Sequence, residues 1–247
     1  MFVAASSRCF EDVSLDEACQ QVADLGYDKI ELWLDEKTEH LKPSYVAENP
    51  DRFFTQYREC TRLTPIAFGM ESDVPLAVFD GLCRASKMLK ITQITIPASP
   101  LGTPFNEEID RLRSRLASAN SSGIRLSLKT KTGFLTEDPQ TAVELCQAVP
   151  GLGLTLDPSY YITGRFANKS YDQVFPYVYH VHLRDTLPTE LQVPVGLGEI
   201  DYSRIIGLLR RQNYMRALSA EILPSLLNGH DRALELRKLR MLLETLL

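Results

Sequence analysis

GLGLTLDPSYYITG at residues 151–164, YVYHVHLRDT at 177–186 and VPVGLGEID at 193–201 are the stretches that decide the fold. Alternate side chains of a strand share a face, so the leucines of the first stretch lie on one face and Asp157 lies on the other. In the second stretch the same alternation places two histidines and Arg184 opposite the apolar side chains. Since a strand buried on both faces normally reads as continuous aliphatic residues, these polar faces predict a polar barrel interior or a cleft.

Length and charge limit the classes of protein and of partner. The chain has 247 residues, 44% of them hydrophobic, and a formal net charge of −5. A chain of this length can bury a large core, and single α/β barrels of this length are common. We therefore expect one domain over residues 1–247. The acidic balance and the lack of a dense Lys/Arg run argue against nucleic acid and anionic membranes as partners, so small metabolites are expected.

Cysteine usage and hydropathy indicate the compartment. The cysteines are scattered and lack CxxC spacing, which suggests neither a disulfide framework nor a cysteine zinc site. The opening MFVAASSR has a short apolar run and no basic leader, and no stretch approaches the roughly 18 apolar residues of a membrane span. These features predict a cytoplasmic protein without membrane partners.

Strand and helix patterns alternate along the whole chain. We expect strands at 2–7, 29–35, 65–70, 91–97, 124–130, 152–157, 179–184 and 217–222. We expect helices at 14–25, 45–61, 75–89, 106–120, 138–148, 201–211 and 231–247, and a short helical stretch at 171–175. Eight such pairs without a glycine-rich dinucleotide fingerprint favour a (β/α)8 TIM barrel, an α/β fold, over an open doubly wound sheet.

Four motifs resemble a known superfamily when they are taken in order. DPSYY begins at Asp157, HVHLRD at His180 and GLGEID at Gly196, and LSAEI contains Glu221. Their order and spacing resemble the xylose-isomerase-like TIM-barrel superfamily, which includes sugar-phosphate isomerases and epimerases and the AP endonucleases of family 2. The resemblance covers nearly the whole chain and implies a TIM barrel of carbohydrate metabolism.

The resemblance also implies four positions for one divalent metal. In the superfamily the ligands are typically a Glu ending strand five, an Asp ending strand six, a His on strand seven and a Glu ending strand eight. The matching residues are Lys129, Asp157, His182 and Glu221. A lysine ammonium cannot coordinate a cation, and its charge opposes a divalent ion. A family histidine three residues after the strand-six Asp is replaced as well, by Tyr160.

Two states of this altered site follow. In the first, the ammonium of Lys129 stands where the metal would be, with Asp157 and Glu221 as counterions, and no metal is tightly bound. In the second, Lys129 swings out on its flexible stem. Asp157, His182 and Glu221 would then hold Mn²⁺ or Mg²⁺, and water would complete the shell.

The candidate substrate-binding residues are Glu31, Trp33, Arg184 and Tyr160. Glu31 either lines the barrel or pairs with a lysine or with Arg184, and Trp33 is interpreted as a pocket wall. Arg184 either clamps a carboxylate or phosphate or pairs with Asp185.

Two further features have both a structural and a functional interpretation. His180 lies lower on its strand than His182 and is interpreted as a hydrogen-bonded interior histidine. The turn from Gly196 to Gly198 is either a phosphate site or a flexible turn before a helix.

The function that the resemblance implies is an isomerase or epimerase for a sugar, sugar phosphate or related polyhydroxy ketone. The reaction is proton abstraction next to a carbonyl, which needs a base and a positive group at the developing enolate oxygen. Glu221 is the expected base, and Asp157 and His182 are expected to position the electrophile, either a metal or Lys129. The alternative is a catalytically reduced barrel that binds a sugar-like ligand.

A third interpretation, an AP endonuclease, ranks below both. The three-metal cluster of that branch uses several additional histidines, whereas this chain has four, and we expect His40 and His230 away from the site. The acidic balance also provides no electrostatic footprint for DNA. The apolar last helix packs either on its own barrel or on a second copy, which leaves a homo-oligomer open.

Overall fold

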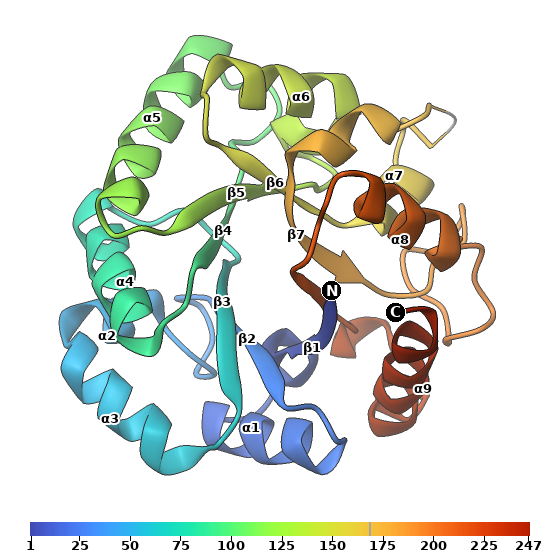
Figure 1. The fold of residues 1–247 in the computed structure, drawn as a ribbon, viewed down its shortest axis with the longest axis horizontal. Helices are drawn as coiled ribbons and strands as arrows, with labels where there is room; N and C mark the ends of the chain where they lie inside the picture. Colours follow the sequence, from blue (N-terminus) through green and yellow to red (C-terminus); the bar gives the residue numbers. More distant parts are fainter. Residues whose placement is uncertain (168) are drawn as a thin grey trace.

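The computed structural model describes residues 1–167 and 169–247 and contains a closed parallel barrel (Figure 1). The strands follow one another around it in chain order, and β1 pairs with β8. Their bounds are β1 Phe2–Ser6, β2 Lys29–Leu34, β3 Thr64–Met70, β4 Gln93–Pro97, β5 Arg125–Lys129, β6 Gly153–Leu156, β7 Val178–Leu183 and β8 Ala217–Ala220. The predicted (β/α)8 barrel is confirmed, and each predicted strand lies within two residues of its observed ends.

Helices cover the outside of the barrel (Figure 1). They are α1 Leu15–Asp24, α2 Pro43–Glu48, α3 Pro50–Cys60, α4 Leu76–Leu89, α5 Phe105–Ser121, α6 Pro139–Ala148, α7 Pro158–Thr163, α8 Tyr202–Arg211 and α9 Arg232–Leu246. Short 3-10 segments are η1 Ser7–Phe10, η2 Leu135–Glu137, η3 Asp172–Tyr177 and η4 Pro224–Leu226. Side-chain oxygens of Ser14, Asp201 and Asp231 accept hydrogen bonds from the first turns of α1, α8 and α9, which is how such residues start helices.

The helix predicted over 45–61 is wrong as a single element. The structure has two helices there, α2 and α3, with Asn49 between them in a non-helical conformation at φ −143°. Pro50 explains the break, because a proline lacks the N–H for helix bonding and disfavours the helical conformation of the preceding residue. The side chain of Asn49 then accepts from Arg52 N and caps α3. A second difference is α7, which the sequence pattern did not predict.

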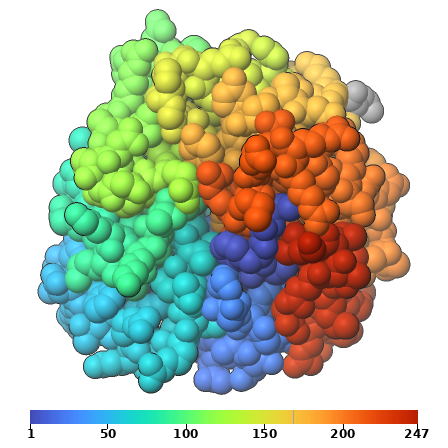
Figure 2. Space-filling model, viewed as in Figure 1, coloured from blue at the N-terminus to red at the C-terminus, as the bar shows by residue number. Residues whose placement is uncertain are grey.

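The barrel interior is polar, as the strand alternation predicts. A layer of small hydroxyl side chains crosses it: the Thr155 hydroxyl lies 2.7 Å from that of Thr95 and 2.6 Å from that of Ser127. The alternate leucines Leu126 and Leu154 face the surrounding helices and are fully buried. Side chains close over the barrel axis on the face seen in Figure 2, so the barrel is a packed core.

The last helix packs on its own barrel. Helix α9 contacts β1, β8 and α8, and Leu236, Leu239 and Leu243 on its inner face are fully buried. The carbonyl of Leu236 also accepts a hydrogen bond from the Tyr27 hydroxyl at 2.9 Å. This apolar face is therefore used within the chain. Within the described residues, the helices are all too short or too polar to cross a membrane.

Candidate active site

The ammonium of Lys129 lies at the centre of a buried charge cluster. Lys129 ends β5 and Glu221 follows β8, and Lys129 Nζ donates to Glu221 Oε1 at 2.8 Å and Oε2 at 2.6 Å. The same nitrogen lies 3.7 Å from Asp157 Oδ2. Lys129 is only 5% exposed and Glu221 1%. The parity of β5 and β8 thus brings both residues inward from opposite parts of the sequence.

The guanidinium of Arg184 forms the second bridge of this cluster. Its Nη2 lies 2.9 Å from Asp157 Oδ2 and also pairs with Glu221 Oε2. Its Nε donates to the Glu221 carbonyl at 2.9 Å, and its Nη1 donates to the Ser159 hydroxyl at 2.6 Å. Both carboxylates raise the pKa of Arg184, although burial alone would lower it. Arg184 therefore pairs with Asp157 and Glu221, and not with Asp185, which was considered as its partner from the sequence.

Asp157 is positioned by the start of α7. Its Oδ1 accepts from the backbone N–H of Ser159 at 3.3 Å and from the Ser159 hydroxyl, so it is the N-cap of α7. Its backbone N–H donates to the Thr130 hydroxyl at 2.8 Å. One oxygen is thereby held by the helix and the other faces Arg184, which fixes the direction of the carboxylate.

Two residues at the mouth, Arg8 and Glu71, were missed by the sequence reasoning. Arg8 Nη1 lies 3.8 Å from Glu221 Oε1 and 2.9 Å from Glu71 Oε2, and Lys131 Nζ donates to Glu71 Oε1 at 2.6 Å. Arg8 is the second residue after β1, and Glu71 follows β3 directly. Residues just after barrel strands lie at the mouth, so their place in the chain was the available signal.

Three cations and an imidazole surround the Glu221 carboxylate. Burial would raise the pKa of Glu221, but the charges of His182, Lys129, Arg184 and Arg8 hold it well below its ordinary value of 4.5. Glu221 is therefore a carboxylate at neutral pH. Its strength as a base depends on whether these cations stay in contact with it.

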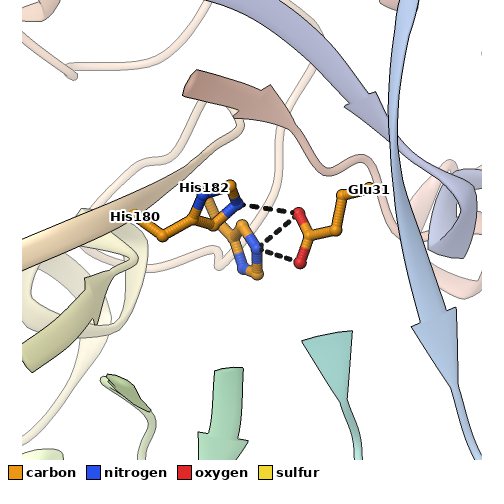
Figure 3. Close-up of side chains that lie close together, drawn as sticks. All are labelled: Glu31, His180 and His182. Carbon is orange, nitrogen blue, oxygen red and sulfur yellow. Dashed lines mark hydrogen bonds and ion pairs between the residues drawn. The ribbon is translucent and has the colours of Figure 1, made fainter. Parts of the chain in front are cut away.

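Glu31 faces the histidines of β7 (Figure 3). His182 Nε2 lies 2.9 Å and 2.8 Å from the Glu31 oxygens, and His180 Nε2 lies 3.0 Å from Oε2. His180 is a hydrogen-bonded interior residue, as predicted, and also lies 3.1 Å from the Ser219 hydroxyl. Glu31 therefore pairs with imidazoles instead of the lysine or arginine partners considered from the sequence.

Trp33 and Tyr160 are the aromatic members of the site. The guanidinium of Arg8 lies 5.2 Å from the centroid of the Trp33 ring, and that of Arg184 lies 5.6 Å from the Tyr160 ring. The indole N–H of Trp33 is buried and has no hydrogen-bond partner in the part of the chain that the structure describes. Both rings cover the charge cluster, and the indole nitrogen offers an unused donor.

Arg184 also reaches a cavity of about 90 Å³ between the loops after β7 and β8. Gln192, Ile222 and His230 contribute to its lining. His230, which was expected away from the site, borders this cavity. His40 lies elsewhere, with its ring nitrogens 2.8 Å from the Val13 carbonyl and 2.9 Å from the Ser7 hydroxyl.

The turn at Gly196 and Gly198 holds a carboxylate of the chain itself. Asp185 Oδ2 accepts from Gly196 N at 2.7 Å and from Gly198 N at 3.0 Å. A Cβ atom at Gly198 would lie 2.1 Å from Asp185 Oδ1. The backbone donors that a phosphate would need are occupied, so this stretch is a structural turn.

The family metal position is filled by cations of the protein. Donor atoms of Asp157, His182 and Glu221 lie within 4.8 Å of one another, close enough to share an ion. Lys129 Nζ however lies 2.6 Å from Glu221 Oε2 and 3.7 Å from Asp157 Oδ2, and Arg184 Nη2 pairs with both carboxylates. Two permanent charges at these oxygens oppose a divalent ion, so the residues do not fit a metal there in this arrangement.

These features define a TIM-barrel protein with a buried charge cluster at the carboxyl ends of β5 to β8. The chain belongs to the xylose isomerase-like TIM barrel family, whose sequence profile matches residues 19–242. Among curated proteins, none matches this sequence.

Several solved structures share the fold at low identity. A xylose isomerase-like TIM barrel protein from Mycobacterium smegmatis in complex with magnesium has a TM-score of 0.77 and 19% identity over 99% of this chain and 97% of that one. D-psicose 3-epimerase with D-tagatose from Clostridium cellulolyticum H10 has a TM-score of 0.75 and 16% identity over 100% and 98%. The probable 3-DHS dehydratase of petrobactin synthesis from Bacillus anthracis has a TM-score of 0.73 and 19% identity over 99% of both chains. At these identities the likeness concerns the fold alone.

Proposed function

We propose that this protein is an isomerase or epimerase acting on a sugar, a sugar phosphate or a related polyhydroxy carbonyl compound. The observation that carries the proposal is the contact of Lys129 Nζ with both oxygens of Glu221. Removal of a proton next to a carbonyl needs a base and a positive group at the developing enolate oxygen. A carboxylate and an ammonium held side by side in a buried site supply these two groups.

In the proposed reaction the substrate carbonyl oxygen takes the place of Glu221 as the partner of Lys129. Glu221 removes the proton from the neighbouring carbon, and the electron pair of the broken C–H bond moves to the carbonyl oxygen. Lys129 stabilises the resulting enolate. In isomerisation Glu221 returns the proton to the former carbonyl carbon, and the hydroxyl proton of the neighbouring carbon moves to the former carbonyl oxygen. In epimerisation a second acid returns a proton to the opposite face of the same carbon, because return to the original face regenerates the substrate. The pKa of Glu221 is lowered partly by Lys129, so turning the ammonium toward the substrate makes Glu221 a stronger base.

The remaining site residues have binding roles in this proposal. Asp157 and His182 orient hydroxyl groups, and Arg184 reinforces the positive potential at the oxygen. Trp33, Tyr160 and Glu31 border the bound sugar. The indole N–H of Trp33, which has no partner among residues 1–167 and 169–247, supports this role, because a buried donor without a partner is costly unless a ligand satisfies it.

Exchange of substrate hydrogen with deuterated water tests the enzyme directly. Ketoses, aldoses and their phosphates are incubated with the protein in deuterated water, and NMR follows loss of the C–H signal next to the carbonyl. Exchange at one carbon, absent with Glu221→Gln, supports the proposal. No exchange in any compound that the protein binds contradicts it.

The second candidate is a barrel that binds a sugar-like ligand without turning it over. It is favoured by the saturation of Glu221, both of whose oxygens are already paired with Lys129. Saturable binding in calorimetry with no deuterium exchange into the bound sugar would identify this function.

We further propose a single domain over residues 1–247, working in the cytoplasm on small molecules and not on nucleic acid. The formal net charge of −5 supports the last point. An AP endonuclease remains the least favoured function, because His40 bonds Ser7 and Val13 away from the charge cluster. Sedimentation analysis of the purified protein tests whether it forms a homo-oligomer.

A further inference from the structure

Three buried side chains deeper in the barrel bring metal-ligating atoms together outside the Lys129 cluster. Glu31 extends from β2 and His180 and His182 extend from β7, and the three converge inside the barrel (Figure 3). Each offers a ligand atom within 4.8 Å of the others. All three are at most 2% exposed. Within residues 1–167 and 169–247, no lysine or arginine nitrogen forms an ion pair with Glu31.

The neighbouring residues support these ligands. A Cβ atom at Gly69 would lie 2.5 Å from Glu31 Oε1, so the glycine of β3 leaves the space that the carboxylate occupies. His182 Nδ1 lies 3.4 Å from Glu221 Oε1 and has no hydrogen-bond partner among the described residues. Metal-ligating histidines commonly donate their other N–H to a carboxylate, and Glu221 stands in that place.

We propose that Glu31, His180 and His182 form a zinc site. Two imidazoles and one glutamate with a fourth position for water are a ligand set that zinc uses. Imidazole nitrogens favour zinc over magnesium. The site shares His182 with the family position, but neither Lys129 nor Arg184 forms an ion pair with Glu31 in the described part of the chain.

Binding requires small movements and a change of tautomer. Zinc bonds of about 2.0–2.2 Å in a tetrahedron separate neighbouring donors by about 3.3–3.5 Å. The distances from Glu31 Oε2 to the Nε2 atoms of His180 and His182, now 3.0 and 2.8 Å, would increase by a few tenths of an ångström. The hydrogen on each Nε2 moves to Nδ1 as the metal replaces it, and His182 then donates Nδ1–H to Glu221.

Calorimetric titration of the chelator-treated protein with Zn²⁺ tests the site. We expect one equivalent to bind at micromolar strength or tighter. His180→Asn should weaken binding at least ~10-fold, because the loss of a partner that only supports a ligand already has an effect of this size. Asp157→Asn is the matched control, because it alters only the family position, and it should leave zinc affinity within about 3-fold. The reverse order of the two variants, or no binding by the wild type, overturns the proposal.

X-ray absorption at the zinc edge gives an answer that does not depend on variants folding. The proposed site provides two imidazole ligands, whereas Asp157, His182 and Glu221 provide one. Scattering from two imidazole rings in the zinc-loaded wild type supports the proposal. One ring or none refutes it.

Discussion

Lys129 Nζ lies 2.8 Å and 2.6 Å from the two carboxylate oxygens of Glu221, so a cation on β5 holds an acid that follows β8. Removing these two charges from water is costly unless hydrogen bonds and opposite charges in the interior compensate each of them. Arg184 and Asp157 supply the remaining charges, because Arg184 pairs with the carboxylates of both Asp157 and Glu221. The cluster is therefore a self-neutralised unit that a substrate has to open.

The first prediction concerns the base. Glu221→Gln keeps the shape and hydrogen bonding of residue 221 but removes its basicity, so turnover of a confirmed substrate should fall by ~10²-fold or more. The Michaelis constant should change much less, since a missing base affects the transition state and not ground-state binding. Steady-state kinetics measure both quantities. Unaltered turnover in this variant would rule out Glu221 as the base.

The face of each strand was predictable from the sequence. Because side chains alternate with period two, the inward placement of Lys129, Asp157, His182 and Glu221 followed from the apolar side chains beside them in their strands. The partners across the barrel were not predictable in this way. The pairing of Glu31 with β7 depends on strand tilt and stagger, which alternation in one strand does not contain.

Residues outside regular strand patterns were harder to place. Arg8 lies in η1 and Ser159 in α7, and neither segment has a periodic pattern long enough to be recognised. The break at Pro50 was different, because the proline itself is a signal against a continuous helix. The residues on either side of Asn49 are helical in α2 and α3, so the proline alone marked the break between the two helices.

The second prediction concerns acid stability and a carboxylate outside the site. Glu108 on α5 is buried, accepts from Ser99 N at 3.0 Å and pairs with Arg111 Nε at 2.8 Å. Burial would raise the pKa of Glu108, but the hydrogen bonds and charge of Arg111 and Ser99 lower it. Glu108→Gln should cost about 1–3 kcal/mol at neutral pH.

The pH dependence of this cost follows from the lowered pKa of Glu108. A group with a depressed pKa contributes stability that is complete above its ordinary value of 4.5 and disappears as the pH falls through the folded value. The difference between wild type and Glu108→Gln in urea unfolding should therefore shrink on acidification. Glu107→Gln, at an exposed neighbour, is the control and should change little. A difference that grows in acid would contradict the assignment.

The third prediction concerns the turn that follows β7. Gly198→Ala places a Cβ atom 2.1 Å from Asp185 Oδ1, so the carboxylate must leave the backbone donors of Gly196 and Gly198. We expect a loss of roughly 1–3 kcal/mol in the free energy of unfolding. Gly207→Ala in α8 meets nothing within 4 Å and should be neutral or stabilising by up to about 1 kcal/mol. Equal effects of the two variants would show that Asp185 does not restrain the turn.

The last prediction concerns the charge balance around Lys129. Lys129 and Arg184 supply two positive charges that contact the two carboxylates Asp157 and Glu221, so these four residues are neutral together. Lys129→Glu leaves one positive charge and three carboxylates, a net charge of −2, which is the charge that one divalent ion neutralises.

We therefore expect Lys129→Glu to create or sharpen Mn²⁺ or Mg²⁺ binding at Asp157, His182 and Glu221. Carboxylates favour these ions, and the ammonium that opposed them is gone. Calorimetry with Mn²⁺ measures the change, and Lys131→Glu is the control, because Lys131 pairs with Glu71 and lies outside the three ligands. The contradicting result is micromolar Mn²⁺ binding by the wild type that Lys129→Glu leaves unchanged. Removal of the ammonium would then make no electrostatic difference at the site, so the ammonium would not stand in for the metal.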